Sequence, residues 1–391
     1  MIKLLAQIKR RTPLGWLQLN HEKGRLMVAI AGIAFADVLM FMQLGFQASL
    51  YDSNTRVNRS MNADIILISP KALNLQNVST FSRRRLLQAQ DVPGVAQANA
   101  LYISNLTWKN PQTHLNATVQ VLGFDPDQPA FDLPLVNEQL DKLKLPDMVL
   151  FDRRARGEYA AAIAKVDAGE VVTTEAEGRT LTIAGIFEMG ASFGADASLM
   201  VSDQTFLQIF KRREAGSVSV GLLQVKAGYD HEQVAATLRD YLPEDVQVLR
   251  MAEYITFEEN YWRVASPVGV IFGLGTAMAF VVGIVIVYQV LSTDVNAHLK
   301  EYATFKAMGY HNSYLLIVVF EEAIILAVLG FIPGTILPIG LYALAANATA
   351  LPLYMTVTRA SVVLTLTVVM CAISGAIATR KLQSADPADM F

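Results

Sequence analysis

Four long apolar stretches separated by polar segments dominate the hydropathy pattern of this chain. Each is long enough to cross the hydrocarbon core of a membrane, which takes about 20 mostly apolar residues in a helix. The predicted spans are 26–50, 266–290, 314–345 and 360–379. The first resembles a signal peptide in its position, but no small-residue cleavage site interrupts its apolar run before Gln47, so we expect it to be retained.

The segment 51–265 has no spanning stretch and alternates short β-rich runs with helical ones. Strands are predicted at 63–70, 117–124, 169–187 and 219–228, with a hairpin turn at Glu177-Gly178. Helices are predicted at 81–90, 203–214 and 231–242, with Asp203 as an N-cap. The pattern predicts a membrane protein with four transmembrane helices and a large mixed α/β extracytoplasmic (periplasmic) domain between helices 1 and 2.

The distribution of Lys and Arg predicts the orientation, because cytosolic loops near membrane helices are enriched in both. Six of these cations precede the first span, two lie in the loop 291–313 and two open the tail 380–391. The segment between the third and fourth spans, 346–359, has no charge before its final residue. We therefore expect an inner (plasma) membrane protein with both termini and 291–313 in the cytosol, and 51–265 in the periplasm.

The first 25 residues contain apolar positions on one helical face and basic positions on the other, followed by Trp16. This arrangement predicts an interfacial amphipathic segment lying on the inner leaflet. A disordered basic leader is the alternative.

The composition and the spacing of particular residues exclude several kinds of chemical site. The chain has 391 residues, of which 53% are hydrophobic, and a formal net charge of −3, which gives no reason to expect binding to nucleic acid. A single cysteine, Cys371, excludes an intrachain disulfide, and no two histidines have the spacing of a helical zinc pair. The segment 185–192 has the glycine spacing of a phosphate-binding loop, but Ala191 replaces its lysine. We expect no catalytic residues, metal or cofactor, and no nucleotide-binding site in this chain.

Three carboxylates fall within the predicted spans, where ionisable groups are costly and often functional. Asp37 lies near the middle of the first span, and Glu321 and Glu322 lie near the cytosolic end of the third. They either face the helix bundle and bond to polar side chains, which we favour, or contact substrate or carry protons.

Small residues spaced four apart allow helices to approach closely. Two such pairs are Gly269 with Gly273 and Gly330 with Gly334. They serve either self-association or packing within one chain, and the sequence does not decide between these uses.

The cytosolic loop contains a predicted amphipathic helix from 294 to 309. Thr293 or Asp294 can cap its start and Gly309 can end it. We expect this helix to seat in a groove of a separate motor protein; resting on lipid headgroups is the alternative. The candidate coupling residues are Asp294, Leu299, Glu301, Tyr302, Phe305, Lys306, Met308 and Gly309.

The residues 301–309, Glu-Tyr-Ala-Thr-Phe-Lys-Ala-Met-Gly, resemble the pattern E-x-[GA]-x-x-[KR]-A-[LM]-G. That pattern belongs to permeases of FtsX/MacB-type ABC transporters, which have one helix, a large periplasmic domain and three further helices. Within the family, the stretches 13–19, 29–46 and 301–310 are most similar to permeases of cyanobacterial glycolipid exporters. MacB itself carries an ATPase ahead of its first helix, whereas 25 residues precede it here.

The resemblance implies a separate ABC ATPase subunit, a periplasmic membrane-fusion adaptor, a TolC-like outer-membrane protein and a permease homodimer in contact with membrane lipid. It also implies export of a lipid-like substrate. The alternative is an FtsX-like regulator whose outer domain activates a cell-wall hydrolase.

Overall fold

The computed structural model describes residues 23–298, 304, 308–309 and 312–383. The chain forms two compact units. The helical unit holds the described parts of 23–47, 271–344 and 353–383, and the sheet unit holds 48–270 and 345–352.

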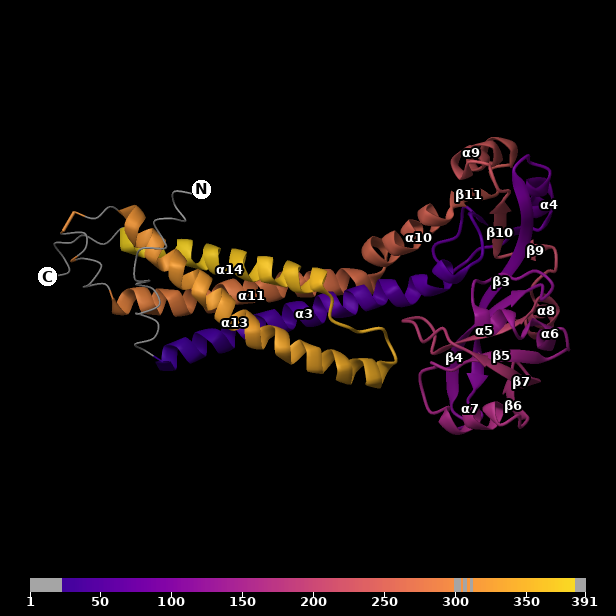
Figure 1. Cartoon of the computed structure of the whole chain (residues 1–391), viewed down its shortest axis with the longest axis horizontal. Helices are drawn as coiled ribbons and strands as arrows, with labels where there is room; N and C mark the ends of the chain where they lie inside the picture. The colour runs from indigo at the N-terminus through magenta and orange to yellow at the C-terminus, as the bar shows by residue number, and fades with distance from the viewer. Residues whose placement is uncertain (1–22, 299–303, 305–307, 310–311, 384–391) are drawn as a thin grey trace. The chain divides into compact units, whose positions relative to one another are not determined.

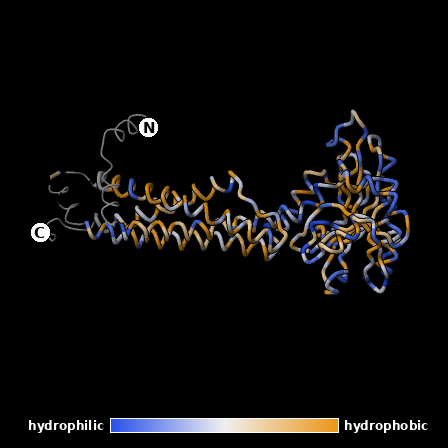
Figure 2. The backbone as a smooth tube through the Cα atoms, turned by 60° about the horizontal axis from the view of Figure 1, so that its bottom comes forward, coloured by the Kyte–Doolittle hydropathy of each residue, from blue (hydrophilic) through white to orange (hydrophobic). Residues whose placement is uncertain are grey.

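Four long helices build the helical unit and are labelled in Figure 1: α3 (Lys23–Ser60), α11 (Pro267–Ala297), α13 (Asn312–Thr349) and α14 (Val357–Gln383). Each is long and apolar enough to cross a membrane, and Figure 2 shows the apolar character along these helices. Small and aliphatic side chains from all four helices form one core, which includes Ala36, Leu291, Ala323 and Met370.

Two helix ends differ from the sequence prediction. α3 continues ten residues past Leu50 because Ser53, Asn54 and Thr55 bond back to carbonyls of the preceding turn, which keeps polar residues compatible with the helix. α11 runs to Ala297, so Thr293 and Asp294 lie inside it. Predicting either as the N-cap of a separate helix was therefore wrong.

The sheet unit contains a nine-stranded mixed sheet with the order β11-β1-β10-β3-β4-β8-β5-β7-β6. The β4–β8 and β5–β7 pairs are parallel and the other neighbours are antiparallel. The strands are β1 (Ile65–Ile68), β3 (Val95–Lys109), β4 (Asn116–Phe124), β5 (Met148–Asp152), β6 (Val172–Ala176), β7 (Arg179–Phe187), β8 (Ala197–Ser202), β10 (Val220–Val225) and β11 (Gln247–Arg250). β2 (Phe81–Ser82) and β9 (Ser217–Val218) form a separate pair. This confirms the predicted mixed α/β domain between the first two apolar helices.

Two details of this domain test the local predictions. Glu177 and Gly178 have φ of 48° and 71° between β6 and β7, which is the backbone of a tight hairpin turn and confirms the prediction there. The N-cap of α8 (Asp203–Ile209) is Ser202, whose side chain accepts from the Thr205 amide. The prediction of Asp203 was off by one residue, and α8 ends before 214 because Phe210 leaves the helical conformation.

Seven further short helices complete the sheet unit: α4 (Arg84–Gln90), α5 (Pro134–Asn137), α6 (Leu140–Leu143), α7 (Ala160–Asp167), α9 (His231–Tyr241), α10 (Met251–Asn260) and the π-helical turn η1 (Tyr261–Ala265). Two apolar cores occupy the unit. The larger contains Trp108, which is fully buried and stacks on Phe151 with ring centroids 5.2 Å apart.

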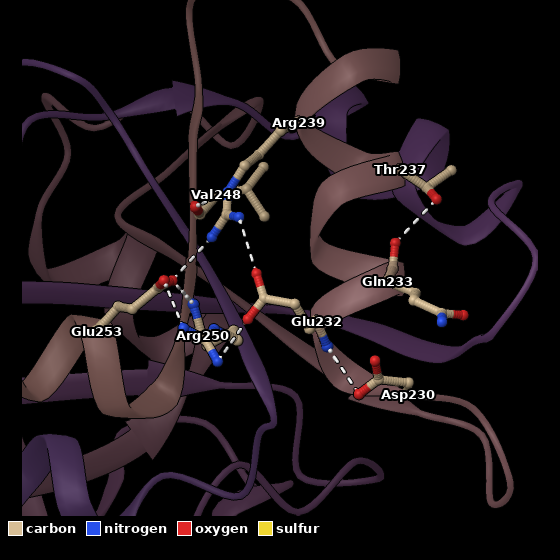
Figure 3. Close-up of polar contacts among 8 residues, drawn as sticks. All are labelled: Asp230, Glu232, Gln233, Thr237, Arg239, Val248, Arg250 and Glu253. Carbon is tan, nitrogen blue, oxygen red and sulfur yellow. Dashed lines mark hydrogen bonds and ion pairs between the residues drawn. The ribbon is translucent and has the colours of Figure 1, made fainter.

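A four-residue ion-pair network links α9, β11 and the start of α10 (Figure 3). Arg250 contacts Glu232 at 2.6 Å and Glu253 at 2.9 Å, and Arg239 contacts Glu253 at 2.8 Å. Single exposed pairs contribute little to stability, but a shared network restricts all its members together. It therefore fixes the first turn of α10, the helix that leads into α11.

Candidate functional site

The described part of the coupling segment comprises residues 294–298, at the end of α11, and residues 304, 308 and 309. His298 Nδ1 is 3.1 Å from the Asp294 carbonyl oxygen and 3.7 Å from its carboxylate. Further on, the Met308 amide donates to the Thr304 carbonyl at 3.0 Å, and Gly309 has a φ of 90°, a conformation that favours glycine and commonly ends a helix. The other predicted coupling residues lie outside the described residues: Leu299, Glu301, Tyr302, Phe305 and Lys306.

Two predicted residues from different segments come together at this end of the helical unit. Asp294 of α11 and Glu322 of α13 are both buried, and their carboxyl groups interact electrostatically. A cavity of about 10 Å³ beside Asp294 is also lined by Arg25 and has room for about one water molecule. Glu321, the neighbour of Glu322, is only partly buried. The arrangement places a basic and two acidic side chains where α3, α11 and α13 meet.

Asp37 is fully buried among the membrane helices. The Thr367 hydroxyl of α14 donates to its Oδ1 at 2.6 Å. A Cβ added at Gly334 would lie 2.7 Å from the Asp37 Cβ, and one at Gly330 would lie 2.5 Å from Ile33. Both glycines of this pair therefore allow α13 to pack closely on α3 of the same chain.

The other small-residue pair has a different environment. A Cβ added at Gly269 would lie 1.8 Å from the Trp262 carbonyl oxygen, so that position requires glycine where η1 turns into α11. The nearest atom to a Cβ at Gly273 belongs to Gln47, at 3.9 Å, which is ordinary contact. Local backbone geometry therefore accounts for Gly269, and nothing within the described chain requires glycine at Gly273.

The sheet unit holds a buried carboxylate that the sequence analysis did not single out. Glu258 of α10 is fully buried and accepts from the Trp262 indole at 2.8 Å and from the Leu75 amide at 2.9 Å. Burial raises its pKa to about 7, although both hydrogen bonds favour the charged form. Its four-residue spacing from Trp262 was readable as a helical pair, but nothing in the sequence indicated burial.

A second buried carboxylate, Asp152, organises the loop 188–196. It accepts from the amides of Met189 at 2.9 Å and Gly190 at 2.6 Å. Arg56 of α3 donates to the Met189 carbonyl. Burial raises the pKa of Asp152, and the amide donors and the positive charge of Arg56 oppose that shift. The loop is thus held between the end of β5 and α3.

A small polar cavity of about 10 Å³ lies between this loop and Glu258, and Ser53, Gln76 and Ser192 also line it. Within the described residues, no group of three or more His, Cys, Asp or Glu side chains could hold a metal ion.

We predict that Thr367→Val destabilises the helical unit. The change removes the donor to the buried Asp37 carboxylate, and a buried acceptor without its donor costs about 1–3 kcal/mol. Thr365→Val is the matched control, because Thr365 is exposed on the same helix and, like Thr367, bonds to the carbonyl four residues earlier, at 2.8 Å in both cases. Thermal unfolding of the detergent-solubilised protein should show a lower Tm for Thr367→Val; equal Tm values for the two variants would refute the role of this bond.

We also predict that Glu258 makes the stability of the sheet unit depend on pH. Its pKa is 4.5 in the unfolded chain and about 7 when folded, so the folded state binds the proton more tightly. The contribution is therefore fully present below pH 4.5 and is lost as pH rises to about 7, a loss of about 3 kcal/mol. Because Glu258→Gln cannot ionise, its stability relative to the wild type should rise by about that amount between pH 4.5 and pH 8.

Urea unfolding of the full chain, followed by tryptophan fluorescence, measures this difference at each pH. Glu259→Gln is the control, because Glu259 lies next to Glu258 and instead pairs with Arg59 at 3.0 Å on the surface. Its pH profile should parallel that of the wild type. A Glu258→Gln profile parallel to the wild type would contradict the prediction.

Two family models match the chain. Residues 26–241 match the MacB-like periplasmic core domain, and residues 273–387 match the FtsX-like permease C-terminal region. A search of curated proteins found no match.

Solved structures were also compared. The periplasmic region of MacB from Actinobacillus actinomycetemcomitans is 10% identical, with a TM-score of 0.34, over 51% of this chain and 94% of that one. The extracellular domain of the ABC-type transporter YknZ from Gram-positive bacteria is 15% identical, with a TM-score of 0.32, over 48% and 100%. A domain of a permease protein from Porphyromonas gingivalis is 14% identical, with a TM-score of 0.29, over 48% and 86%.

The first family match alone spans more than half of the 391 residues, and the second covers most of the remaining membrane helices. The two matches follow each other in the order in which the sheet unit and the last three helices occur in the chain. The chain therefore belongs to the FtsX/MacB-type family of ABC transporter permeases.

Proposed function

We propose that this chain is the permease subunit of a MacB-like exporter that transmits ATP-driven motion to its periplasmic domain. The observation that carries the proposal is the continuity of the helices. α3, α11 and α13 each have residues in both compact units, so the helical backbone is continuous across each of these boundaries. A displacement at the cytosolic end of such a helix is carried along its length by the hydrogen-bonded backbone.

In this proposal, the segment 294–309 receives the motion of the ATPase on the cytosolic side. Of its predicted coupling residues, the structure describes Asp294, Met308 and Gly309. ATP is hydrolysed by a separate DevA-like ABC ATPase subunit whose groove receives this segment. The carboxylates Asp294 and Glu322 and the basic Arg25 lie where three helices meet beside it, which supports a role in passing motion from the segment into the bundle.

The proposed substrate is lipid-like, and the resemblance of 13–19, 29–46 and 301–310 to DevC, the permease of the cyanobacterial heterocyst glycolipid exporter, favours a glycolipid. The described helices fill their shared core with residues such as Ile33, Val287 and Leu326. That packing favours loading from the outer leaflet or the periplasm over passage through a central pore.

The remaining partners follow from the same proposal. A DevB-like membrane-fusion adaptor and a TolC-like outer-membrane protein form the exit duct, and two permease chains form a homodimer. The protein lies in the inner membrane with both termini in the cytosol. An FtsX-like regulator of a cell-wall hydrolase shares the same permease architecture, and purification from detergent with mass identification of partners separates the two: an adaptor supports export, and a hydrolase supports regulation.

We predict that Lys306→Ala and Glu301→Ala uncouple the permease from its ATPase. Each removes a charge of the coupling motif, and losing a contact of about 1.4 kcal/mol weakens the interaction about tenfold. The measurement is permease-stimulated ATP hydrolysis in the reconstituted complex. Lys300→Ala removes a neighbouring charge outside the motif and should behave as the wild type; unchanged stimulation in Lys306→Ala and Glu301→Ala would rule out the assigned coupling role.

A further inference from the structure

The guanidinium group of Arg156 contacts two separate parts of the sheet unit, the loop 188–196 and the end of α13. Its Nε donates to the Thr349 carbonyl at 2.7 Å, its Nη1 to the Asp196 carboxylate at 3.0 Å and its Nη2 to the Ser192 carbonyl at 3.0 Å. The Arg156 amide also donates to the Asp196 carbonyl at 2.7 Å. Each guanidinium nitrogen therefore has its own acceptor, an arrangement that the fixed fork of arginine provides and lysine does not.

The Thr349 carbonyl is the last one of α13. The final carbonyls of a helix have no partner within it and carry a partial negative charge, so a cation is stabilising there. Ala350, with a φ of 54°, ends the helix immediately afterwards. Arg156, almost 200 residues away in sequence, thus caps the end of the third apolar helix, whose residues 345–349 belong to the sheet unit.

Neighbouring arginines do not share this role. Arg153 pairs with Asp167 at 2.7 Å and Arg154 pairs with Glu188 at 2.7 Å, and both arginines are exposed. Among the described residues, neither of these arginines bonds to α13. Arg153 has the same side chain as Arg156 and also pairs with an aspartate, so Arg153 is a matched control.

The loop 188–196, to which the Arg156 guanidinium donates hydrogen bonds, is also attached to α3. Arg56 of α3 donates to the Met189 carbonyl at one end of the loop. In its middle, the Gln76 side chain lies against Gly194 and donates to Asn54 of α3 at 3.0 Å. Ser192 Oγ accepts from the amides of Gly194 and Ala195 at 3.2 and 3.1 Å, which stiffens the turn.

We propose that Arg156 and the loop 188–196 form a rigid link that makes the end of α13 move together with α3. Motion of the third apolar helix then reaches the sheet unit directly, in addition to motion through α3 and α11. Arg156 is a positioning residue for transport, and this role rests on the proposed export function. The link itself is a property of the sheet unit and can be measured independently of any substrate.

The first measurement is the distance distribution between spin labels at Asn347→Cys and Gln128→Cys, two exposed positions of the sheet unit, in the full chain with Cys371→Ser. The wild type and Arg153→Ala should give one narrow distribution. In Arg156→Ala it should broaden or split, because losing charge-assisted bonds of about 1.5–3 kcal/mol raises the population of a detached α13 end about tenfold or more. Arg156→Lys keeps the positive charge but loses the forked donors, so the width of its distance distribution should lie between those of the wild type and Arg156→Ala. If Arg156→Ala does not fold, Arg156→Lys is measured in its place.

The second measurement is the ratio of ATP hydrolysed to fluorescent glycosyl diacylglycerol extracted from proteoliposomes by the complete complex. Arg156→Ala should raise this ratio about tenfold while Arg153→Ala leaves it unchanged. An Arg156→Ala distribution as narrow as that of the wild type, or an equal change in Arg153→Ala, overturns the link. A wild-type complex that extracts no lipid overturns the export proposal instead, and the label distances still decide whether the link exists.

Discussion

The continuity of α3 is the constraint on which the rest of the structure depends. In hydrocarbon, backbone polar groups must be satisfied within the helix, so the apolar part of α3 has to be helical. In the sheet unit that requirement no longer applies, yet the helix continues to Ser60 with Ser53, Asn54 and Thr55 buried and bonded to its own carbonyls. One continuous helix therefore has residues in both units, and within the sheet unit Arg56 attaches it to the loop 188–196.

The buried carboxyl groups of the two units accept hydrogen bonds from different kinds of donor. Asp37 in the membrane bundle receives a hydroxyl donor from Thr367, whereas Asp152 in the sheet unit is held by backbone amides and Glu258 by an indole and an amide. Amides are fixed by the fold and cannot rotate away, so they define the position of the loop that donates them. Asp152 and Glu258 thereby position backbone segments beside α3 and α10.

Arginine side chains attach three helices to the rest of the sheet unit. The Arg250 network fixes the first turn of α10, Arg56 holds α3 to the loop 188–196, and Arg156 holds the end of α13 to the same loop. Arginine suits these positions because its planar donors engage several acceptors in one geometry. The proposed transmission of motion to the sheet unit requires such attachment, since a loosely held helix end would move without displacing the sheet.

The sequence by itself determined the four apolar helices, the mixed domain between the first two and the hairpin at Gly178, because these depend on local hydropathy and turn chemistry. It did not reveal strand β3, whose Asn99 and Asn105 interrupt any alternation and whose pairing with distant strands holds it in place. It marked Asp37 and Glu322 but could not place Thr367 or Asp294 beside them. Tertiary structure alone decided that Glu258 is buried and that Arg156, rather than Arg153, reaches α13, because burial and partner choice depend on chain segments far apart in sequence.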